Sequence, residues 1–375
     1  MALKTMAKIN ISVEIVSSSI KSLSSMSQKS RLAILDLLAP HYQNVSVTIV
    51  DTVSDLEELV ARKPDLVFLG MKFVPANAAL GIHDPHKIWV SEYLDNNGIT
   101  YTGSNQLAYE LEQDKSLAKQ CVMDAGLQTS PFYVVAQNST TLDGVANLPY
   151  PLFVKPTDRK SGLGIDKNSV VNNYAQLMAK VSALAVDLRA DALVETYLPG
   201  QEFSVAVLKK LDSEEYLVMP VELAAPVNSN GHRILSEIVK SDDTETVSMV
   251  DDDLLRLKIN KLALNVFIAL GARDYGRIDI RLDQHGTPNF LEANLVPGLS
   301  TGYFIRACLM NEGFDKSTVI QHITELGRNR TKIMVSNVID PVGIFQLLES
   351  ALVLPSSKNV AISASDIDQI TLYKA

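Results

Sequence analysis

The sequence predicts an α/β protein, α+β in part, that begins with a doubly wound parallel sheet. Short β-branched apolar runs alternate with segments whose apolar residues recur at helical spacing, which favours a parallel sheet with helices on both faces. A β-hairpin is predicted near residues 275–294, so a later part of the chain should be antiparallel. A chain of 375 residues is long enough for two or three domains with buried cores.

The first 104 residues are expected to form a small α/β domain of their own, because strands and helices alternate there. Strands are predicted at 8–16, 45–50 and 65–70. Helices are predicted at 29–38, 55–61 and 88–96. The segment 98–104 is expected to be a short strand that ends in a loop of small residues.

The following region combines helices with short strands around a glycine-containing loop. Helices are expected at 105–126 and 174–188, and strands at 131–136 and 151–155. The loop from Lys155 to Gly164 has a basic residue at a strand end and two glycines, which would allow backbone N–H groups to approach phosphates. Taken alone, the loop also fits an ordinary surface hairpin. It matches neither a dinucleotide-binding nor a Walker motif.

The predicted hairpin carries the strongest chemical signal in the sequence. Apolar and polar residues alternate in its first strand, and a turn at 284–287 leads into the second. Because side chains repeat every second residue, the polar groups of each strand share a face. The side chains that an in-register pairing would bring together are Arg277, Asp279, Glu292 and Asn294.

Two carboxylates and an amide oxygen suit a hard cation, and we expect Asp279, Glu292 and Asn294 to bind Mg²⁺ or Mn²⁺. Carboxylates this close would repel each other unless a cation lay between them. The alternative is the exposed polar face of an ordinary hairpin. The Pro297–Gly298 turn would present backbone N–H groups beside the metal, which favours the metal site.

The motif Arg-x-Asp at 277–279, followed by Leu-Glu-x-Asn-x-x-Pro-Gly-Leu-Ser at 291–300, resembles the metal-binding signature of the D-alanine–D-alanine ligase family of ATP-grasp enzymes. The resemblance covers about residues 105–304. It implies an ATP-grasp fold with an N-terminal α/β domain (1–104), a central lid domain (105–190) and a C-terminal catalytic domain (191–338). Residues 339–375 run beyond the usual end of the family and are expected to form a C-terminal extension.

The resemblance also implies how ATP is bound. In Glu-x-x-Leu-x-Gly-x-Glu at 195–202, Glu195 would accept from the adenine amino group, the backbone of Leu198 would meet the ring edge, and Glu202 would hold the ribose. Leu291 would pack on the purine, and burial in the core is an equally good interpretation of this residue. For Glu195 and Glu202, the alternative is a solvent-exposed position at the end of a strand. The remaining expected contacts are Lys115 and Lys155 at the phosphates and Lys240 in a loop that closes over them.

The reaction implied by the resemblance joins a carboxylate to an amine. ATP would phosphorylate the carboxylate of one substrate, the amine of the other would attack the acyl phosphate, and ADP and phosphate would leave. Arg277 and the backbone N–H of Gly298 would stabilise the negative oxygen, and Ser161 aligns with the first serine of the family's glycine-rich loop. Tyr303 and Phe304 stand where the family binds the terminal carboxylate; they would enclose a bulkier acceptor or belong to the core.

The two amino-acid pockets depart from the family. Its first loop, Gly-Gly-x-Ser-x-Glu, is replaced by the serine-rich segment 17–25, and its His-Gly-x-x-Gly-Glu-Asp-Gly is replaced by 71–77. Because a pocket that hydrogen-bonds one substrate rejects others strongly, these changes argue against simple dimerisation of D-alanine. The function predicted is therefore an ATP-dependent ligase that joins two amino-acid-like substrates. The alternatives are a true D-alanine–D-alanine ligase and a non-catalytic ATP-binding protein.

Composition indicates which kinds of partner and which cellular compartment to expect. A net charge of −9 argues against a nucleic-acid surface. Cys121 and Cys308 are the only cysteines, which fits a reducing compartment. The sequence has no signal-peptide pattern and no apolar run of membrane-spanning length. We expect a cytoplasmic protein that binds small amino-acid-like substrates, with no nucleic-acid or membrane partner, and that dimerises through its first domain as family members do.

Overall fold

The computed structural model describes residues 7–24, 26–139, 141–159 and 162–338. The chain divides into two compact units, Met1–Thr331 and Lys332–Ala375. All elements below belong to the first unit, apart from the end of the last helix. Ser161 and the predicted extension 339–375 lie outside the described residues.

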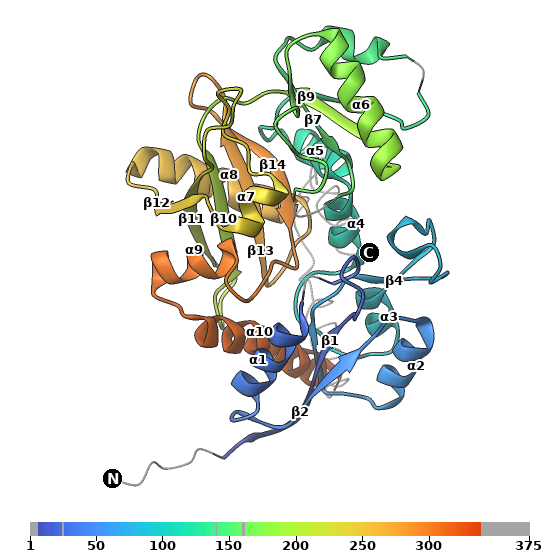
Figure 1. The fold of residues 1–375 in the computed structure, drawn as a ribbon. Coiled ribbons are helices and arrows are strands. Elements are labelled where there is room, and N and C mark those ends of the chain that lie inside the picture. Colours follow the sequence, from blue (N-terminus) through green and yellow to red (C-terminus); the bar gives the residue numbers. More distant parts are fainter. Residues whose placement is uncertain (1–6, 25, 140, 160–161, 339–375) are drawn as a thin grey trace, which may run out of the picture. The chain divides into compact units, whose positions relative to one another are not determined.

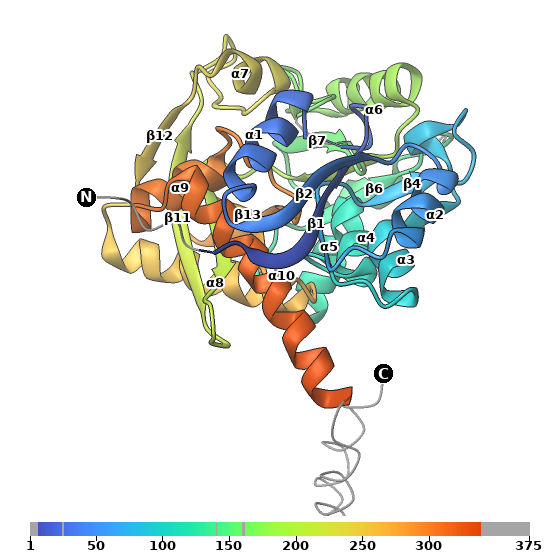
Figure 2. The same cartoon turned by 90° about the horizontal axis from the view of Figure 1, so that it is seen from below.

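The N-terminal sheet is parallel, as predicted, with strand order β2-β1-β3. Its strands are β1 (Ile9–Ser17), β2 (Tyr42–Ile49) and β3 (Leu66–Leu69). The helices are α1 (Gln28–Leu38), α2 (Val53–Ala61) and α3 (Val90–Asn96). One face packs on α1, with Ile15 and Phe68 buried against Ile34, and Figure 2 shows α1 along β1 and β2. The other face packs on α2 and α3, so the sheet is doubly wound.

Two small elements after β3 were not predicted. A short antiparallel pair forms from β4 (Phe73–Pro75) and β5 (Lys87–Trp89), with the 3-10 helix η1 (Gly81–His83) between them. The predicted helix at 88–96 begins at Val90, because Ile88 pairs with Val74 in this ribbon. Tyr101 forms a parallel bridge to Val67, which places the predicted 98–104 strand beside β3.

The central sheet is antiparallel, with strand order β6-β9-β7-β8. Its strands are β6 (Phe132–Val135), β7 (Leu152–Pro156), β8 (Val170–Val171) and β9 (Ala192–Thr196). Helices α4 (Gln106–Gln113) and α5 (Lys115–Asp124) and the 3-10 helix η2 (Asp143–Asn147) precede β7, and α6 (Tyr174–Leu188) covers the sheet (Figure 1). β9 lies beyond residue 190 in sequence but belongs to this sheet, so the central sheet extends to Thr196.

The C-terminal sheet is antiparallel, with strand order β12-β11-β10-β13-β14. Its strands are β10 (Glu202–Lys209), β11 (Tyr216–Ala224), β12 (Thr246–Met249), β13 (Tyr275–Leu282) and β14 (Pro288–Asn294). The helices are α7 (Glu237–Asp242), α8 (Asp253–Ala269), α9 (Tyr303–Glu312) and α10 (Lys316–Val338).

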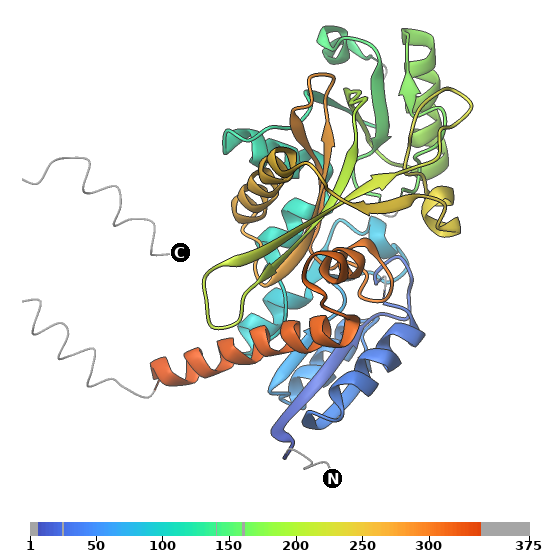
Figure 3. The same cartoon turned by 90° about the vertical axis from the view of Figure 1, so that its left-hand side faces the viewer.

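Because side chains alternate along β13, its apolar and its polar residues lie on opposite faces of this sheet. Ile278 and Ile280 are fully buried in the core that contains α8. Tyr275 faces the other way, into the core with α9. Figure 3 shows the two helices on opposite sides of the sheet. Arg277, Asp279 and Arg281, which alternate with the two isoleucines, therefore face the side of α9, where a site can form. No helix in the described part of the chain is long and apolar enough to span a membrane.

Candidate active site

β13 and β14 pair as antiparallel strands, which confirms the predicted hairpin. Arg277 lies opposite Asn294, and Asp279 lies opposite Glu292. Like charges that face each other across two strands repel. Arg277 offsets part of this repulsion, because its Nε and Nη2 donate to the two oxygens of Asp279 at 3.0 and 2.9 Å. Ser204 Oγ donates to the same carboxylate at 2.7 Å. The hairpin thus holds two acids in a fixed geometry.

A β-bulge in β14 changes which side chains reach the site. Asp279 pairs with Glu292, but the next residue, Ile280, pairs with Phe290. Leu291 is therefore an extra residue in its strand. Strict alternation would turn Leu291 and Glu292 to opposite faces, whereas both line the same pocket. The bulge places an apolar side chain directly beside an acidic one.

Glu292 is held as a carboxylate by the lysines around it. Burial alone would raise its pKa, but nearby positive charges, first that of Lys115, lower the pKa to about 2. Lys115 Nζ lies 3.8 Å from Glu292 Oε2. The other charges that lower the pKa belong to Lys240, Lys155 and Arg277. Glu292 is consequently ionised throughout the neutral range.

A pocket of about 590 Å³, part of it open to solvent, is lined by residues of both the central and the C-terminal sheet and of α7. Ligand sites for small molecules commonly have volumes in this range. Its apolar wall is made by Phe153, Ile165, Ile234 and Leu235. Of the residues predicted from the sequence, those that line it are Lys155, Glu195, Leu198, Glu202, Lys240, Asp279, Leu291 and Glu292.

The pocket contains one cation that sequence reasoning did not select. Arg281 lies two residues beyond Asp279 on the same face of β13, and its Nη1 donates to Glu202 at 2.8 Å. Arg281 also donates to the backbone oxygen of Arg233 at 3.0 Å. Burial raises the pKa of Glu202, and the charge of Arg281 opposes that rise. The alternation that selected Asp279 would also have selected Arg281.

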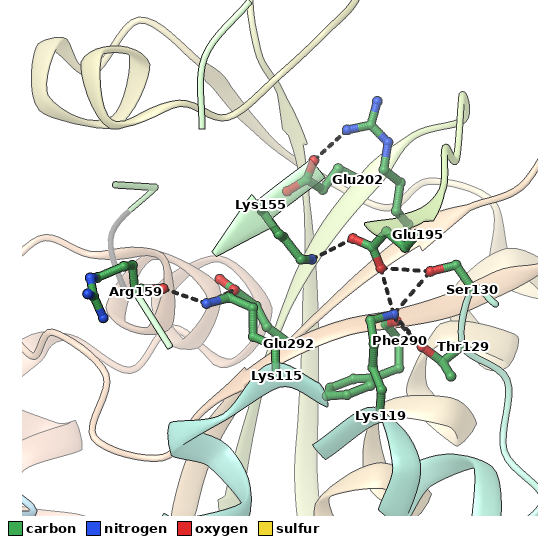
Figure 4. A network of polar contacts seen from close by, with 11 residues as sticks. Lys115, Lys119, Thr129, Ser130, Lys155, Arg159, Glu195, Glu202, Phe290 and Glu292 are labelled. Carbon is green, nitrogen blue, oxygen red and sulfur yellow. Dashed lines mark hydrogen bonds and ion pairs between the residues drawn. The ribbon is translucent and has the colours of Figure 1, made fainter. Parts of the chain in front are cut away.

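A buried network of charges surrounds Glu195 (Figure 4). Lys155 Nζ lies 2.7 Å from one carboxylate oxygen, and Lys119 Nζ lies 2.8 Å from the other. Ser130 Oγ donates to the second oxygen at 2.8 Å. All four side chains are buried. Burial alone would raise the pKa of Glu195, but the two lysines lower it to about 2. The carboxylate predicted to bind adenine is thus already paired with two cations.

Lys119 ties this network to the C-terminal sheet and was not selected from the sequence. Its ammonium group donates to Thr129 Oγ1 at 2.6 Å and to the carbonyl oxygen of Phe290, in β14, at 3.3 Å. Lys119 follows Lys115 by four residues in α5, so both lie on one face of that helix. That spacing is the signal by which the sequence could have identified it.

The remaining predicted residues have separate locations. Gly298 is exposed, in the segment after β14. Tyr303 OH donates to Glu245 at 2.5 Å, and the guanidinium group of Arg277 lies 5.6 Å from the centre of its ring. Phe304 is fully buried and meets Tyr275 edge to face at 5.8 Å between ring centroids. The structure therefore places Phe304 in the core, one of the two alternatives that the sequence left open.

The residues predicted to bind a metal fit a hard cation by their chemistry. Asp279 and Glu292 offer carboxylate oxygens from directly opposite positions, and Asn294 offers an amide oxygen further along β14. Such oxygen ligands suit Mg²⁺, which takes few protein ligands and fills its shell with water and phosphate oxygens. Within the described residues, no group of three or more His, Cys, Asp or Glu side chains could hold a metal without other donors.

Comparison with protein families and sequences identifies relatives of this chain. Residues 121–325 match the family model described as D-ala D-ala ligase C-terminus. An uncharacterized protein, y4sG, of Sinorhizobium fredii is 29% identical over 282 residues, which are 74% of this chain and 80% of that protein. A D-alanine–D-alanine ligase of a Marinomonas species is 31% identical over 252 residues, 64% of this chain and 74% of the relative. A ligase of the same name from Cupriavidus metallidurans is 32% identical over 209 residues, with 55% of this chain and 61% of that protein covered.

Comparison with solved structures shows a shared fold. The structure of D-alanine–D-alanine ligase from Bacillus anthracis complexed with ATP matches with a TM-score of 0.66. The match covers 86% of this chain and 99% of that one, at 20% sequence identity. A second structure of the Bacillus anthracis protein matches with the same TM-score at 21% identity.

Proposed function

Because the chain belongs to the D-alanine–D-alanine ligase family and has the ATP-grasp fold that the sequence predicted, we propose that it is an ATP-dependent ligase that joins the carboxylate of one substrate to the amine of another. A carboxylate oxygen of the first substrate attacks the γ-phosphorus of ATP, and ADP leaves. The amine of the second attacks the carbonyl carbon of the acyl phosphate, loses a proton, and displaces phosphate. Amino acids, and small carboxylic acids and amines similar to them, carry the groups that this reaction joins.

One observation carries this proposal: two facing carboxylates and two lysines, Lys155 and Lys240, line one pocket, and a third lysine, Lys115, lies 3.8 Å from Glu292. Phosphoryl transfer depends on positioning and on neutralising charge rather than on covalent chemistry by the protein. Lys115 of α5, Lys155 of β7 and Lys240 of α7 all act on the charge of Glu292. We propose that these lysines hold the phosphates of ATP, and that a bound triphosphate replaces part of their present interaction with the acids.

The other residues of the pocket would hold the nucleoside. Leu291 and Leu198 provide apolar contact for the adenine ring, and Glu202 would accept from the ribose hydroxyls. Glu195 would accept from the adenine amino group, while Lys119 keeps the carboxylate charged. Metal bound by Asp279, Glu292 and Asn294 would neutralise phosphate charge.

Arg277 and the backbone N–H of Gly298 would stabilise the oxygen that becomes negative when the amine attacks. Arg277 is fixed by its bidentate contact with Asp279, so it needs no reorganisation as charge develops. Preorganised donors of this kind contribute about 10²–10³ in rate. Tyr303 lies against Arg277, and we propose that it borders the acceptor site. We also propose that the protein acts in the cytoplasm and forms a homodimer.

The proposal predicts release of ADP that depends on a substrate pair and on a divalent cation. Purified protein with Mg-ATP would be screened against pairs of L- and D-amino acids and against amino acids paired with apolar carboxylic acids, with ADP measured by a coupled assay and products by mass spectrometry. EDTA in excess over Mg²⁺ should abolish turnover. Consumption of D-alanine alone would instead identify a D-alanine–D-alanine ligase. Nucleotide binding that raises the unfolding temperature without any turnover would indicate a non-catalytic ATP-binding protein.

A substitution at Gly162 tests whether the glycine-containing loop and α7 close over ATP together. A Cβ atom on Gly162 would lie 2.8 Å from the backbone nitrogen of Glu237, at the start of α7, and the residue has a φ of +82°. In Gly162→Ala the loop must move away from the helix that carries Lys240. Because overpacking of this kind costs about 1–3 kcal/mol, the KM for ATP should rise about tenfold or more.

Gly231→Ala is the matched control for this change. Gly231 has nearly the same φ, +80°, but nothing lies within 4 Å of its added Cβ atom. The control carries the same backbone strain without the contact, so its KM for ATP should stay near that of the unmodified protein. Equal KM values for Gly162→Ala and Gly231→Ala would show that the loop and α7 do not cooperate.

A further inference from the structure

A second pocket, of about 400 Å³ and partly open to solvent, lies at the carboxyl ends of the N-terminal strands. Leu69 and Gly70, at the end of β3, line it together with Met26, which belongs to the segment after β1. In the order β2-β1-β3 the winding direction reverses between β1 and β3. Open α/β sheets bind ligands at such reversal points. The location is therefore one where a small-molecule site is expected on topological grounds.

This pocket and the first pocket are lined by residues that lie close together along β13, and along β14 and the segment after it. On one face of β13, Tyr275 lines the second pocket and Asp279 lines the first, with Arg277 between them. Alternate residues of a strand are about 7 Å apart, so Arg277 is within about 7 Å of either residue along the strand. β14 contributes Glu292 to the first pocket, and the chain directly after it contributes Gly298 to the second. A molecule in the second pocket can thus present a carboxylate near Arg277.

The lining of the second pocket is uncharged and mostly apolar, and its polar side chains are those of Ser30, Tyr275 and Ser300. No Asp, Glu, Lys, Arg or His side chain lines it among the described residues. The apolar side chains come from the segment before α1, from α1, from β3 and from the segment after β14. They belong to Met26, Ile34, Leu69, Val296 and Leu299. Placing an ammonium or carboxylate group among them would cost desolvation energy without a partner.

The serine-rich segment before α1 adds no charge to the lining either, because its one charged residue, Lys21, is exposed and does not line the pocket. Three of its hydroxyl groups are engaged within the protein: Ser18 and Ser19 donate to Asp51, and Ser24 donates to the backbone oxygen of Gly70 at 2.7 Å. By contrast, the buried hydroxyl of Tyr275 has no hydrogen-bond partner in the described part of the structure. A buried hydroxyl without a partner is unfavourable, and a ligand oxygen would satisfy it.

We infer that this second pocket binds the carboxylate-donating substrate, and that this substrate has an apolar, uncharged body such as a branched-chain or aryl carboxylic acid. The inference rests on the proposed ligase function and specifies its substrate class. Met26, Ile34, Leu69 and Leu299 select the apolar body, and Tyr275 donates to an oxygen of the acid. One methylene group in such a pocket is worth about 10–200-fold in discrimination.

The test uses hydroxylamine as the amine, so that the acceptor need not be known. With Mg-ATP, the enzyme would convert each acid to its hydroxamate, with release of ADP and phosphate. The acids compared are 4-methylpentanoate, 3-phenylpropanoate, D-alanine, L-glutamate and L-lysine. We expect kcat/KM for the first two to exceed that for D-alanine at least about tenfold. Highest kcat/KM for D-alanine or for a charged acid would overturn the inference while supporting the ligase function.

Two variants test the residues themselves. Ser300→Asp adds a negative charge to the lining, and the matched control Thr301→Asp adds it one residue further on, at an exposed position that does not line the pocket. Only Ser300→Asp should raise the KM for 4-methylpentanoate, by about tenfold or more. Tyr275→Phe should raise the KM for the acid and leave that for ATP unchanged. A purely structural hydroxyl would leave both KM values unchanged.

A binding measurement separates this inference from the proposed reaction. Without nucleotide, 4-methylpentanoate should raise the unfolding temperature of the unmodified protein and of Thr301→Asp, but not of Ser300→Asp. That result with no hydroxamate from any acid would contradict the ligase function and leave the apolar site standing. If 4-methylpentanoate raised the unfolding temperature of none of these proteins, the apolar site would be refuted.

Discussion

Replacing Glu195 by glutamine should lower the free energy of unfolding by about 3–5 kcal/mol, the range observed when one partner of a buried ion pair is removed. The carboxylate lies between Lys119 and Lys155, at 2.8 and 2.7 Å, and all three side chains are buried. In Glu195→Gln two buried ammonium groups would face each other across a neutral amide. Urea unfolding at pH 7 measures the change, and Glu57→Gln, an exposed position on α2, is the control expected to be near zero.

Lys119→Met should be less destabilising than Glu195→Gln, because one lysine and one carboxylate remain as a neutral pair. Burial already lowers the pKa of Lys119 to about 8, so this ammonium group is close to losing its proton. The double variant Lys119→Met/Glu195→Gln leaves only Lys155 charged and should lose less stability than the two single changes added together. A Glu195→Gln variant as stable as the unmodified protein would show that the network contributes no net stabilisation.

The carboxylate of Glu195 also makes the stability of the protein depend on pH. The pKa of Glu195 falls from 4.5 to about 2 on folding, which corresponds to about 3 kcal/mol. Because the pKa is lowered in the folded state, this stabilisation is fully present above pH 4.5 and is lost as the pH falls from 4.5 towards 2. Glu195→Gln should lack this share of the acid dependence.

The sequence predicted the elements that depend on local pattern. The hairpin at 275–294 follows from alternation and turn residues, and the parallel N-terminal sheet follows from alternating strands and helices. Helix α6 has the predicted bounds, 174–188. These features need only near neighbours, so one sequence is enough to predict them.

Features that depend on contacts between distant segments could not be predicted. The bulge that turns Leu291 into the pocket interrupts the alternation on which the prediction relied. Lys119 is indistinguishable from a surface lysine until β9 and β14 bring Glu195 and the carbonyl oxygen of Phe290 to it. Phe304 was selected by its position in a motif, but α9 turns it into the core. The motif spacing therefore identified candidate residues, whereas tertiary packing determined where each side chain points and which charged groups surround it.

Asp279→Asn should reduce turnover at least about 10²-fold, the scale seen when a metal-site group or an oxyanion donor is lost. Asp279 accepts two hydrogen bonds from Arg277 and one from Ser204 Oγ. An asparagine there offers an N–H₂ group to the guanidinium group, which is itself only a donor, so Arg277 loses half of its fixed contact. The substitution also removes one of the two facing charges available to a cation. Steady-state ADP release measures the effect.

Asp283→Asn is the matched control, because it makes the same chemical change on the same hairpin outside both pockets. Asp283 Oδ1 accepts from the backbone N–H groups of His285 and Thr287, and an amide oxygen can still accept both bonds. Its turnover and unfolding temperature should therefore stay near those of the unmodified protein.

Dependence on Mg²⁺ separates the two roles of Asp279. If the carboxylate binds the cation, the Mg²⁺ concentration for half-maximal rate should rise in Asp279→Asn, and excess Mg²⁺ should restore part of the activity. If it only positions Arg277, the rate should fall by the same factor at every Mg²⁺ concentration. Full activity at ordinary Mg²⁺ concentration would exclude both roles. The facing pair on β13 and β14 would then be structural, and the lysines around Glu292 would have to neutralise the phosphates of ATP without an acid-bound cation.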